Sequence, residues 1–190
     1  MKKKKIKFFF LTLLYLLITI ADLSLTYFAT PDLRNEGNPL VTNLQFGWKG
    51  LIITNVITFS VYFLLALYAY VIYKSPKSDE IEVMRYLADI TYDDPEKVSR
   101  GMWRKPKHWS PQIACLCYSV STALPFARFI IIIEWLLIIT DTHAPTFFSI
   151  VAFFPLGRID FFIAVFLAWG LSFKWIYSEC KANKLRILNQ

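Results

Sequence analysis

The sequence lacks the short motifs that mark most enzyme active sites. It has no H-E-x-x-H pair, no G-x-S-x-G turn, no Walker-type glycine loop and no glycine-rich dinucleotide fingerprint. Its two histidines, His108 and His143, flank the third long apolar run, so a membrane would separate them and they could not share a metal ion. Metalloprotease and rhomboid-like chemistry therefore have no support, and a pairing of His143 with Asp141 is left as a weak acid–base alternative.

Cysteine is also scarce. The chain has three cysteines, Cys115, Cys117 and Cys180, all expected at helix ends that face a reducing compartment, where disulfides do not persist. Cys115 and Cys117 are two residues apart, which on a helix points their thiols about 200° apart and disfavours a shared metal. We therefore expect no disulfide and no metal site, and the sequence leaves the identity of any other cofactor open.

Apolar residues, by contrast, make up 56% of the chain and gather in long runs instead of alternating with polar ones. Each run has about the 20 residues that cross a ~30 Å hydrocarbon core as a helix. The sequence therefore predicts an all-α, polytopic membrane protein, a single domain over residues 1–190 with a long loop at 74–112. The four expected transmembrane helices cover residues 8–29, 51–73, 113–139 and 157–177.

The first run is expected to be a membrane helix and not a cleaved signal peptide. It is longer than the roughly 7–15 residues of a secretory h-region, and no small-x-small site follows it within Leu25–Pro31. The region before the last helix is ambiguous, because Thr146–Leu156 is too short to span a membrane. This segment is either re-entrant or the beginning of the fourth helix.

Basic residues are distributed unevenly about these runs. Five precede the first helix, eight lie in the 74–112 loop and four lie at or after the end of the fourth helix. Only two, Arg34 and Lys49, lie in the loop between the first and second helices. The positive-inside rule therefore predicts a multi-pass inner-membrane protein with both termini and the 74–112 loop in the cytoplasm. This asymmetry explains the net charge of +7 without any nucleic-acid partner.

Several apolar runs carry a charged or amide residue at a matching depth. Counted from the expected cytoplasmic helix ends at 1.5 Å per residue, Asp22, Arg128 and Asp160 lie at about 21, 22 and 25 Å, and Asn55 falls in the same outer slab. A charge in hydrocarbon must be paired, hydrated or protonated, so these residues are expected to pair or to handle a ligand. The candidate ligand or ion site comprises Asp22, Thr26, Glu36, Asn38, Asn55, Arg128, Glu134, Arg158 and Asp160.

Two interpretations of this layer stay open. In the first, an Asp22–Arg128 ion pair locks two helices together, and Asp160 and Arg158 satisfy each other or face headgroups. In the second, the layer is a pocket that opens outward, with Glu36 folded over Asp22 so that two carboxylates and an amide oxygen would suit a hard cation or a proton. Ionisable residues at membrane depth are functional by default, which favours the second interpretation.

Polar side chains also recur along the first helix at spacings of three and four, which places them on one stripe that should face protein. The stripe comprises Thr12, Tyr15, Thr19, Asp22 and Thr26. Its end and the following loop read Asp22-x-x-x-Thr26 and Glu36-x-Asn38-Pro39. This pattern resembles a prokaryotic family of small four-helix membrane proteins of unknown function. The resemblance implies the same topology and a role for Asp22, Thr26, Glu36 and Asn38, and it implies no reaction.

The 74–112 loop is expected to be partly helical. Asp79-x-x-Glu82 has the pattern of a capping box that opens a helix through Ile90, and Asp94-Pro95 has the pattern of an N-cap and first-turn proline for a short second helix ending at Gly101. Residues 102–109 interleave tryptophan with cations, a composition typical of a segment on an anionic membrane surface, with docking of a cytosolic partner as the alternative.

These observations favour a non-enzymatic membrane protein whose outward-facing polar site binds or gates a small solute or ion. Four helices enclose little lumen, so we expect it to act as a homo-oligomer or with a cytosolic protein on the 74–112 loop, with membrane lipids around it. One alternative is a membrane-embedded enzyme acting on an outer-leaflet lipid or lipid-linked substrate. In that case Asp22, Glu36 and Asp160 would act as acid–base or metal groups, and Arg128 or Arg158 would bind phosphate. The other is an accessory subunit with a purely structural ion pair.

Overall fold

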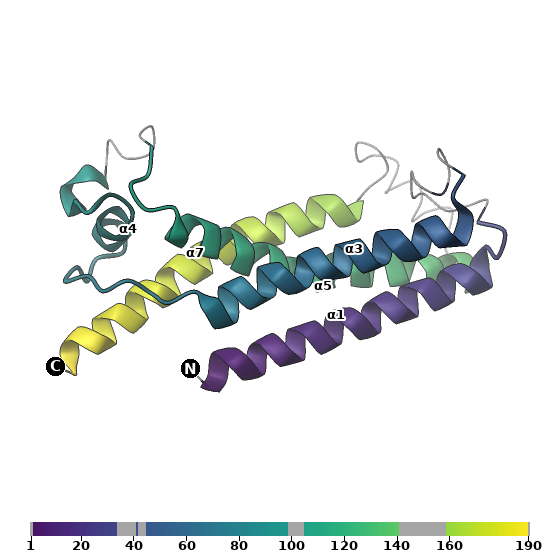
Figure 1. The fold of residues 1–190 in the computed structure, drawn as a ribbon, viewed down its shortest axis with the longest axis horizontal. Helices are drawn as coiled ribbons and strands as arrows, with labels where there is room; N and C mark the ends of the chain where they lie inside the picture. Colours follow the sequence, from purple (N-terminus) through teal and green to yellow (C-terminus); the bar gives the residue numbers. More distant parts are fainter. Residues whose placement is uncertain (1, 34–40, 42–44, 99–104, 141–158, 190) are drawn as a thin grey trace.

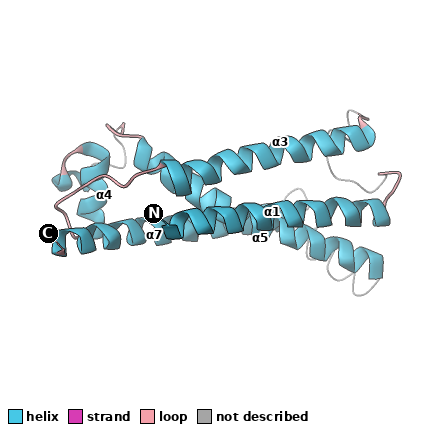
Figure 2. Ribbon diagram, turned by 60° about the horizontal axis from the view of Figure 1, so that its bottom comes forward, coloured by secondary structure: helices cyan, strands magenta, loops and turns pink. Residues whose placement is uncertain are grey.

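Four long apolar helices make up the body of the protein in a computed structural model, which describes residues 2–33, 41, 45–98, 105–140 and 159–189 (Figure 1). The long helices are α1 (Lys2–Ala29), α3 (Gly47–Leu67), α5 (Ser110–Thr140) and α7 (Ile159–Leu188), and a π-helical turn, η1 (Tyr68–Ile72), continues α3. Each is long and apolar enough to cross a membrane. The predicted all-α class with four membrane-spanning helices is confirmed, and the described residues contain no strand (Figure 2).

Helix α5 is the centre of the bundle. It packs most extensively against α7, next against α1 and then against α3, whereas α7 has few contacts with α1. Both chain termini lie at the same end of the bundle as the short helix α4 (Val83–Tyr92) (Figure 1). We call this end, which carries Lys2–Lys7, residues 74–98 and 105–109 and the end of α7, the basic end, and the opposite end the loop end.

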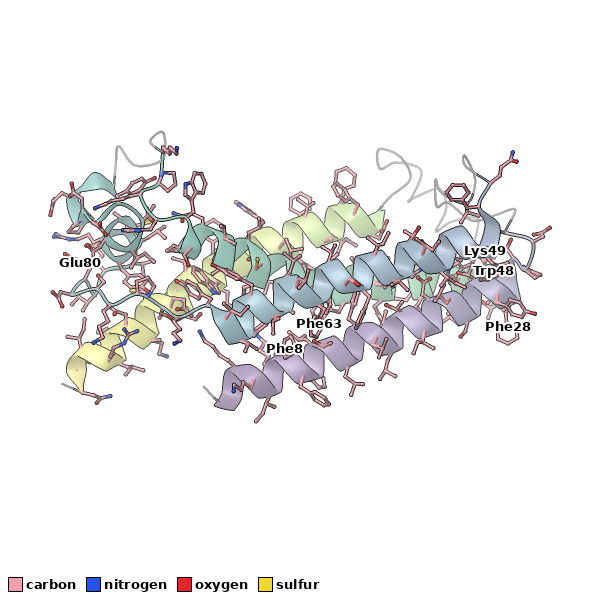
Figure 3. All side chains as sticks on the ribbon, in the orientation of Figure 1. Phe8, Phe28, Trp48, Lys49, Phe63 and Glu80 are labelled. Atoms are coloured by element: carbon pink, nitrogen blue, oxygen red, sulfur yellow. The ribbon has the colours of Figure 1, made fainter. Side chains whose placement is uncertain are left out.

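The lateral surface of the bundle is apolar, as expected for a protein whose solvent is lipid. Phe9 and Phe28 of α1 are 68% and 76% exposed, while Tyr15, Thr19 and Thr26 on the opposite face are buried. The predicted polar stripe of α1 therefore faces protein. Between α1 and α3 the rings of Tyr15 and Tyr62 stack with centroids 4.0 Å apart, and Figure 3 shows Phe8 and Phe63 meeting nearer the basic end.

At the basic end, the segment after η1 is fastened to α7 instead of opening a helix. The Asn183 side chain of α7 donates to the carbonyls of Ser78 and Glu80 at 2.8 and 3.0 Å. Glu179 of α7 accepts hydrogen bonds from Ser75 and from Lys4 of α1. These contacts hold residues 75–81 in an irregular path along α7.

The predicted capping box is therefore wrong. Helix α4 begins at Val83, after the N-cap residue Glu82, and this cap has no side-chain hydrogen bond. The predicted N-cap at Asp94 and first-turn proline at Pro95 are confirmed. Asp94 accepts the Glu96 N–H at 3.1 Å, and the 3₁₀ helix η2 (Pro95–Val98) begins at the proline. The expected end at Gly101 and residues 102–104 lie outside the described residues, as does Thr146–Leu156.

The chain returns to the bundle through a charged cluster around Asp93. Asp93 ends α4 with a left-handed φ of 54° and contacts Lys107 Nζ at 2.5 Å and His108 Nε2 at 2.9 Å. Hydrogen bonds from Lys107, and then from His108, lower the pKa of Asp93. The backbone N–H groups of Lys107 and His108 both donate to the Thr91 carbonyl. Part of the segment expected on a membrane surface is therefore folded against α4.

Candidate functional site

The centre of the candidate site is Arg128, which α5 directs between α1 and α3. Its Nη1 donates to Thr19 Oγ1 of α1 at 2.5 Å, and its Nη2 donates to Asn55 Oδ1 of α3 at 2.6 Å. The guanidinium carbon also lies 5.3 Å from the centroid of the Tyr15 ring, within the range of a cation–π interaction. One side chain thus joins three helices.

Asp22 lies beside this arginine. Its Oδ2 is 3.8 Å from Arg128 Nε, so the predicted pairing of the two charges is confirmed. This distance satisfies an ion pair but exceeds that of an N–H···O hydrogen bond. The two side chains are 13% and 14% exposed, so the pair is largely but not completely desolvated.

A second group, the Trp135 indole, lies close enough to the Asp22 carboxylate to interact with it. An indole N–H can only donate, so it stabilises the ionised carboxylate. Trp135 lies on α5 two helical turns after Arg128, and residues at this spacing share a face. The carboxylate therefore has both a cation and a neutral donor from α5 near it.

Two other residues of the predicted set, Thr26 and Asn55, make hydrogen bonds to backbone carbonyls of their own helices. Thr26 is buried, and its hydroxyl donates to the Asp22 backbone carbonyl at 2.9 Å. Such a bond returns a hydroxyl to the preceding turn of its own helix and needs no ligand. Asn55 likewise donates its amide to the Leu51 carbonyl at 2.9 Å, which leaves its side-chain oxygen facing Arg128. The orientation of Asn55 as an acceptor is thereby fixed.

The remaining members are not brought into this cluster by the contacts described above. Asp160 is buried in the first turn of α7, a helix that packs on α5 and has few contacts with α1. Asp160 and Glu134 both have interactions within the protein. Glu36, Asn38 and Arg158 lie outside the described residues. The predicted meeting of one polar residue from each of four helices is therefore seen for three, through Asp22, Asn55 and Arg128.

Sequence reasoning missed Trp135 and the role of Tyr15 toward the cation. A tryptophan in an apolar run carries no charge signal, but its spacing of seven from Arg128 would have placed both on one face of α5. The sequence places Tyr15 on the protein-facing stripe. Its role toward the cation could have been found from its spacing, because it lies one turn from Thr19 and two turns from Asp22 on the same helix face.

The arrangement can hold the Asp22–Arg128 ion pair in a low-dielectric layer, and Arg128 can exchange Asp22 for another anionic partner. Arg128 presents a planar donor fork suited to carboxylate or phosphate. An anionic group that approached the cluster would compete with Asp22 for this fork, and protonation of Asp22 would release the arginine. Among the described residues no group of three or more His, Cys, Asp or Glu side chains could hold a metal.

Comparison of the chain with protein-family models gave no match, and comparisons with curated proteins and with solved structures gave none either. The class of protein therefore follows from the fold: a multi-pass membrane protein with four apolar helices. The family suggested by the Asp22–Pro39 pattern stays a prediction.

Proposed function

We propose that the protein is a non-enzymatic inner-membrane protein that binds or gates a small anionic solute at the Arg128 cluster. One observation carries this proposal. Arg128 gives its two terminal nitrogens to the neutral oxygens of Thr19 and Asn55, and its contact with Asp22 is a loose 3.8 Å ion pair. A guanidinium held in place by neutral groups and only weakly engaged by its counter-ion is suited to exchange that counter-ion for a ligand.

The orientation we propose places the basic end in the cytoplasm. The support is the count of basic residues, seventeen at the terminal and 74–112 segments against two in the first loop. The Arg128 cluster then lies in the outer half of the membrane and is reached from outside. Because four helices enclose little lumen, passage of a solute would require a homo-oligomer or a partner protein.

The test uses the full chain in mild detergent, with chloride, acetate and inorganic phosphate as probes at constant ionic strength. Binding to the folded state raises the free energy of unfolding by RT ln(1 + [L]/Kd), which is about 1.4 kcal/mol at ten times Kd. We expect one probe to give this stabilisation. Arg128→Gln should abolish it, while Asp22→Asn should strengthen it by removing the competing carboxylate.

The matched control is Ser24→Ala, which alters an exposed hydroxyl of α1 that donates to the Ile20 carbonyl. It should leave the anion response unchanged. If Arg128→Gln fails to fold, Arg128→Lys keeps the charge but loses the fork, and it should weaken the response to acetate and phosphate. Unfolding that is independent of all three anions would contradict the proposal.

The burial of the ion pair favours a second candidate, an accessory subunit in which Asp22 and Arg128 only lock α1 to α5. Under this alternative, Asp22→Ala combined with Arg128→Leu keeps near-native stability and no variant responds to anions. Under the proposed function the combined variant also folds, but it loses an anion response that the native protein has.

A further inference from the structure

The last turns of α7 form one wall of a groove at the basic end. The groove has a volume of about 340 Å³, within the range of small-molecule sites. Its lining residues from α7 recur at spacings of three and four, which places them on one helix face. The groove is lined by Ile81, Val83, Tyr177, Cys180, Lys181, Lys184, Leu185 and Leu188.

This groove lies where apolar side chains of α7 are exposed beyond the part of the helix that lipid tails cover. Helix α7 has 30 residues, about 45 Å of helix, whereas the hydrocarbon core is ~30 Å thick. Its C-terminal end extends past the N-terminal end of α1 (Figure 1). Leu185 and Leu188 are nevertheless 52% and 70% exposed, and Ile81 across the groove is 55% exposed. Lipid tails cover such side chains along the spans but not beyond them.

Hydrogen bonds from the same turns of α7 fix the shape of the groove. Asn183 is buried and bonds the carbonyls of Ser78 and Glu80, and Cys180 Sγ donates to the Ile81 carbonyl at 3.4 Å. These contacts hold Ile81 and Val83 against α7 as the second wall. The groove is therefore preformed by the fold, and a ligand does not have to order it.

Charge identifies the chemistry of the occupant. Lys181 and Lys184 line the groove and are exposed, and none of the described residues that line it is acidic. Of the neighbouring acids, Glu80 is bonded to Arg85 at 3.0 Å and Glu179 to Lys4 at 3.1 Å. An apolar wall with two lysines at its edge matches an amphiphile with an anionic head.

We propose that this groove binds one anionic phospholipid of the leaflet at the basic end. An acyl chain lies along Ile81, Leu185 and Leu188, and the phosphate is bound by Lys181 and Lys184. Tyr177, at the expected membrane boundary, gives the chain an entry from the bilayer. The inference concerns the opposite end of the molecule from Arg128 and does not depend on the anion site proposed there.

The experiment uses the full chain in nanodiscs of phosphatidylcholine with increasing fractions of a phospholipid that carries a photoreactive acyl chain. One series uses a phosphatidylglycerol probe and the other a phosphatidylcholine probe, and mass spectrometry locates the crosslinks. We expect the anionic probe to label residues 81–83 and 177–188 at a lower mole fraction than the zwitterionic probe does. Each basic residue near a membrane surface contributes about fivefold to anionic-lipid binding.

Lys181→Ala combined with Lys184→Ala should therefore raise the mole fraction for half-maximal labelling by about 30-fold at low salt. Arginine at both positions should retain binding. Lys5→Ala combined with Lys105→Ala is the matched control, because it removes the same charge from exposed lysines outside the groove. This control should change the half-maximal fraction by less than about twofold. Leu185→Gln should weaken labelling by both probes.

Three results would overturn the proposal. The first is equal labelling of the groove by the two probes, and the second is labelling no stronger than on the lipid-facing surface of α1 and α3. The third is a disulfide between copies carrying Leu185→Cys that excludes the probe, which would show that a second chain covers the groove. All the substituted side chains are exposed, so native elution and unfolding temperature check that each variant is folded.

Discussion

Removing Asp22 should destabilise the protein more than removing Asp22 and Arg128 together. Asp22→Ala leaves a guanidinium 14% exposed in the membrane layer with Thr19, Asn55 and the Tyr15 ring but no carboxylate. At 3.8 Å and an effective dielectric constant of about 20, the attraction between the two charges is about 4 kcal/mol. Loss of one partner of a buried pair costs about 3–5 kcal/mol.

We expect the lower part of that range, about 3 kcal/mol, for Asp22→Ala because Arg128 keeps its two neutral acceptors. Arg128→Leu leaves the Asp22 carboxylate beside the Trp135 indole but without a counter-ion, and its cost should be similar. The combined variant removes both charges and should lose less than the sum of the single changes. Because the combined variant should also cost less than Asp22→Ala alone, the coupling free energy must exceed the cost of Arg128→Leu, which is about 3 kcal/mol.

The assay is reversible unfolding of the four proteins of this cycle in one detergent, followed by circular dichroism. Ser24→Ala supplies a parallel cycle with Arg128→Leu, since Ser24 is exposed on the same helix and should show no coupling. If the Asp22–Arg128 coupling lies within about 0.5 kcal/mol of zero, the two charges do not stabilise each other and the reasoning from depth and burial is refuted.

Four further predictions can be tested independently. A cysteine at position 35 should react with an impermeant thiol reagent applied from the periplasmic side, and reaction only from the cytoplasm would reverse the topology. Glu36→Gln should raise anion-dependent stabilisation while keeping basal stability if the first loop belongs to the site, because it removes a carboxylate that repels the anion, and an unchanged response would exclude Glu36. Lys107 lowers the pKa of Asp93, so this carboxylate stabilises the fold above its ordinary pKa of 3.8 and loses this effect as the pH falls through the lower folded-state value. Asp93→Asn should therefore speed hydrogen exchange of α4 at pH 7 but not in acid. Equal effects at the two pH values would refute this pH dependence. Asn183→Ala leaves the buried Ser78 carbonyl and the partly buried Glu80 carbonyl without their donor, and it should cost about 2–3 kcal/mol with faster exchange over residues 75–81. Unchanged exchange would show that this anchor is not needed.

The membrane helices could be predicted because each additional apolar residue in a run adds to the same hydropathy signal. About twenty apolar residues establish a span whatever its neighbours are, and depth along a span is a matter of counting. This is why equal depth correctly placed Asp22, Arg128 and Asn55 in one cluster. Depth says nothing about which neighbours a helix has, so the placement of Asp160 in that layer stays a prediction.

Contacts at the basic end could not be predicted, because tertiary bonds there override local preference. Asp79-x-x-Glu82 has the local pattern of a helix start, but the carbonyls of Ser78 and Glu80 are bound by Asn183, more than 100 residues away in sequence. Helix α7 was expected to end near Tyr177 and extends to Leu188. A signal for this extension was present in the spacing of Glu179 and Asn183, which places two polar side chains on one helix face.

Helix α5 connects the two ends of the molecule. Nearer the loop end its Arg128 pairs with the Asp22 carboxylate of α1, and nearer the basic end its Ser119 hydroxyl is bonded to Ser172 of α7 at 2.9 Å. Because α1 has few contacts with α7, a ligand that displaces Asp22 from Arg128 would influence α7 by moving α5 against it. The Lys4–Glu179 ion pair, which ties the start of α1 to α7, opposes such a movement. The geometry therefore makes the α5–α7 contact one route, beside the contacts of α1 and α5 with η1, through which occupancy of the proposed Arg128 site would reach the proposed lipid groove.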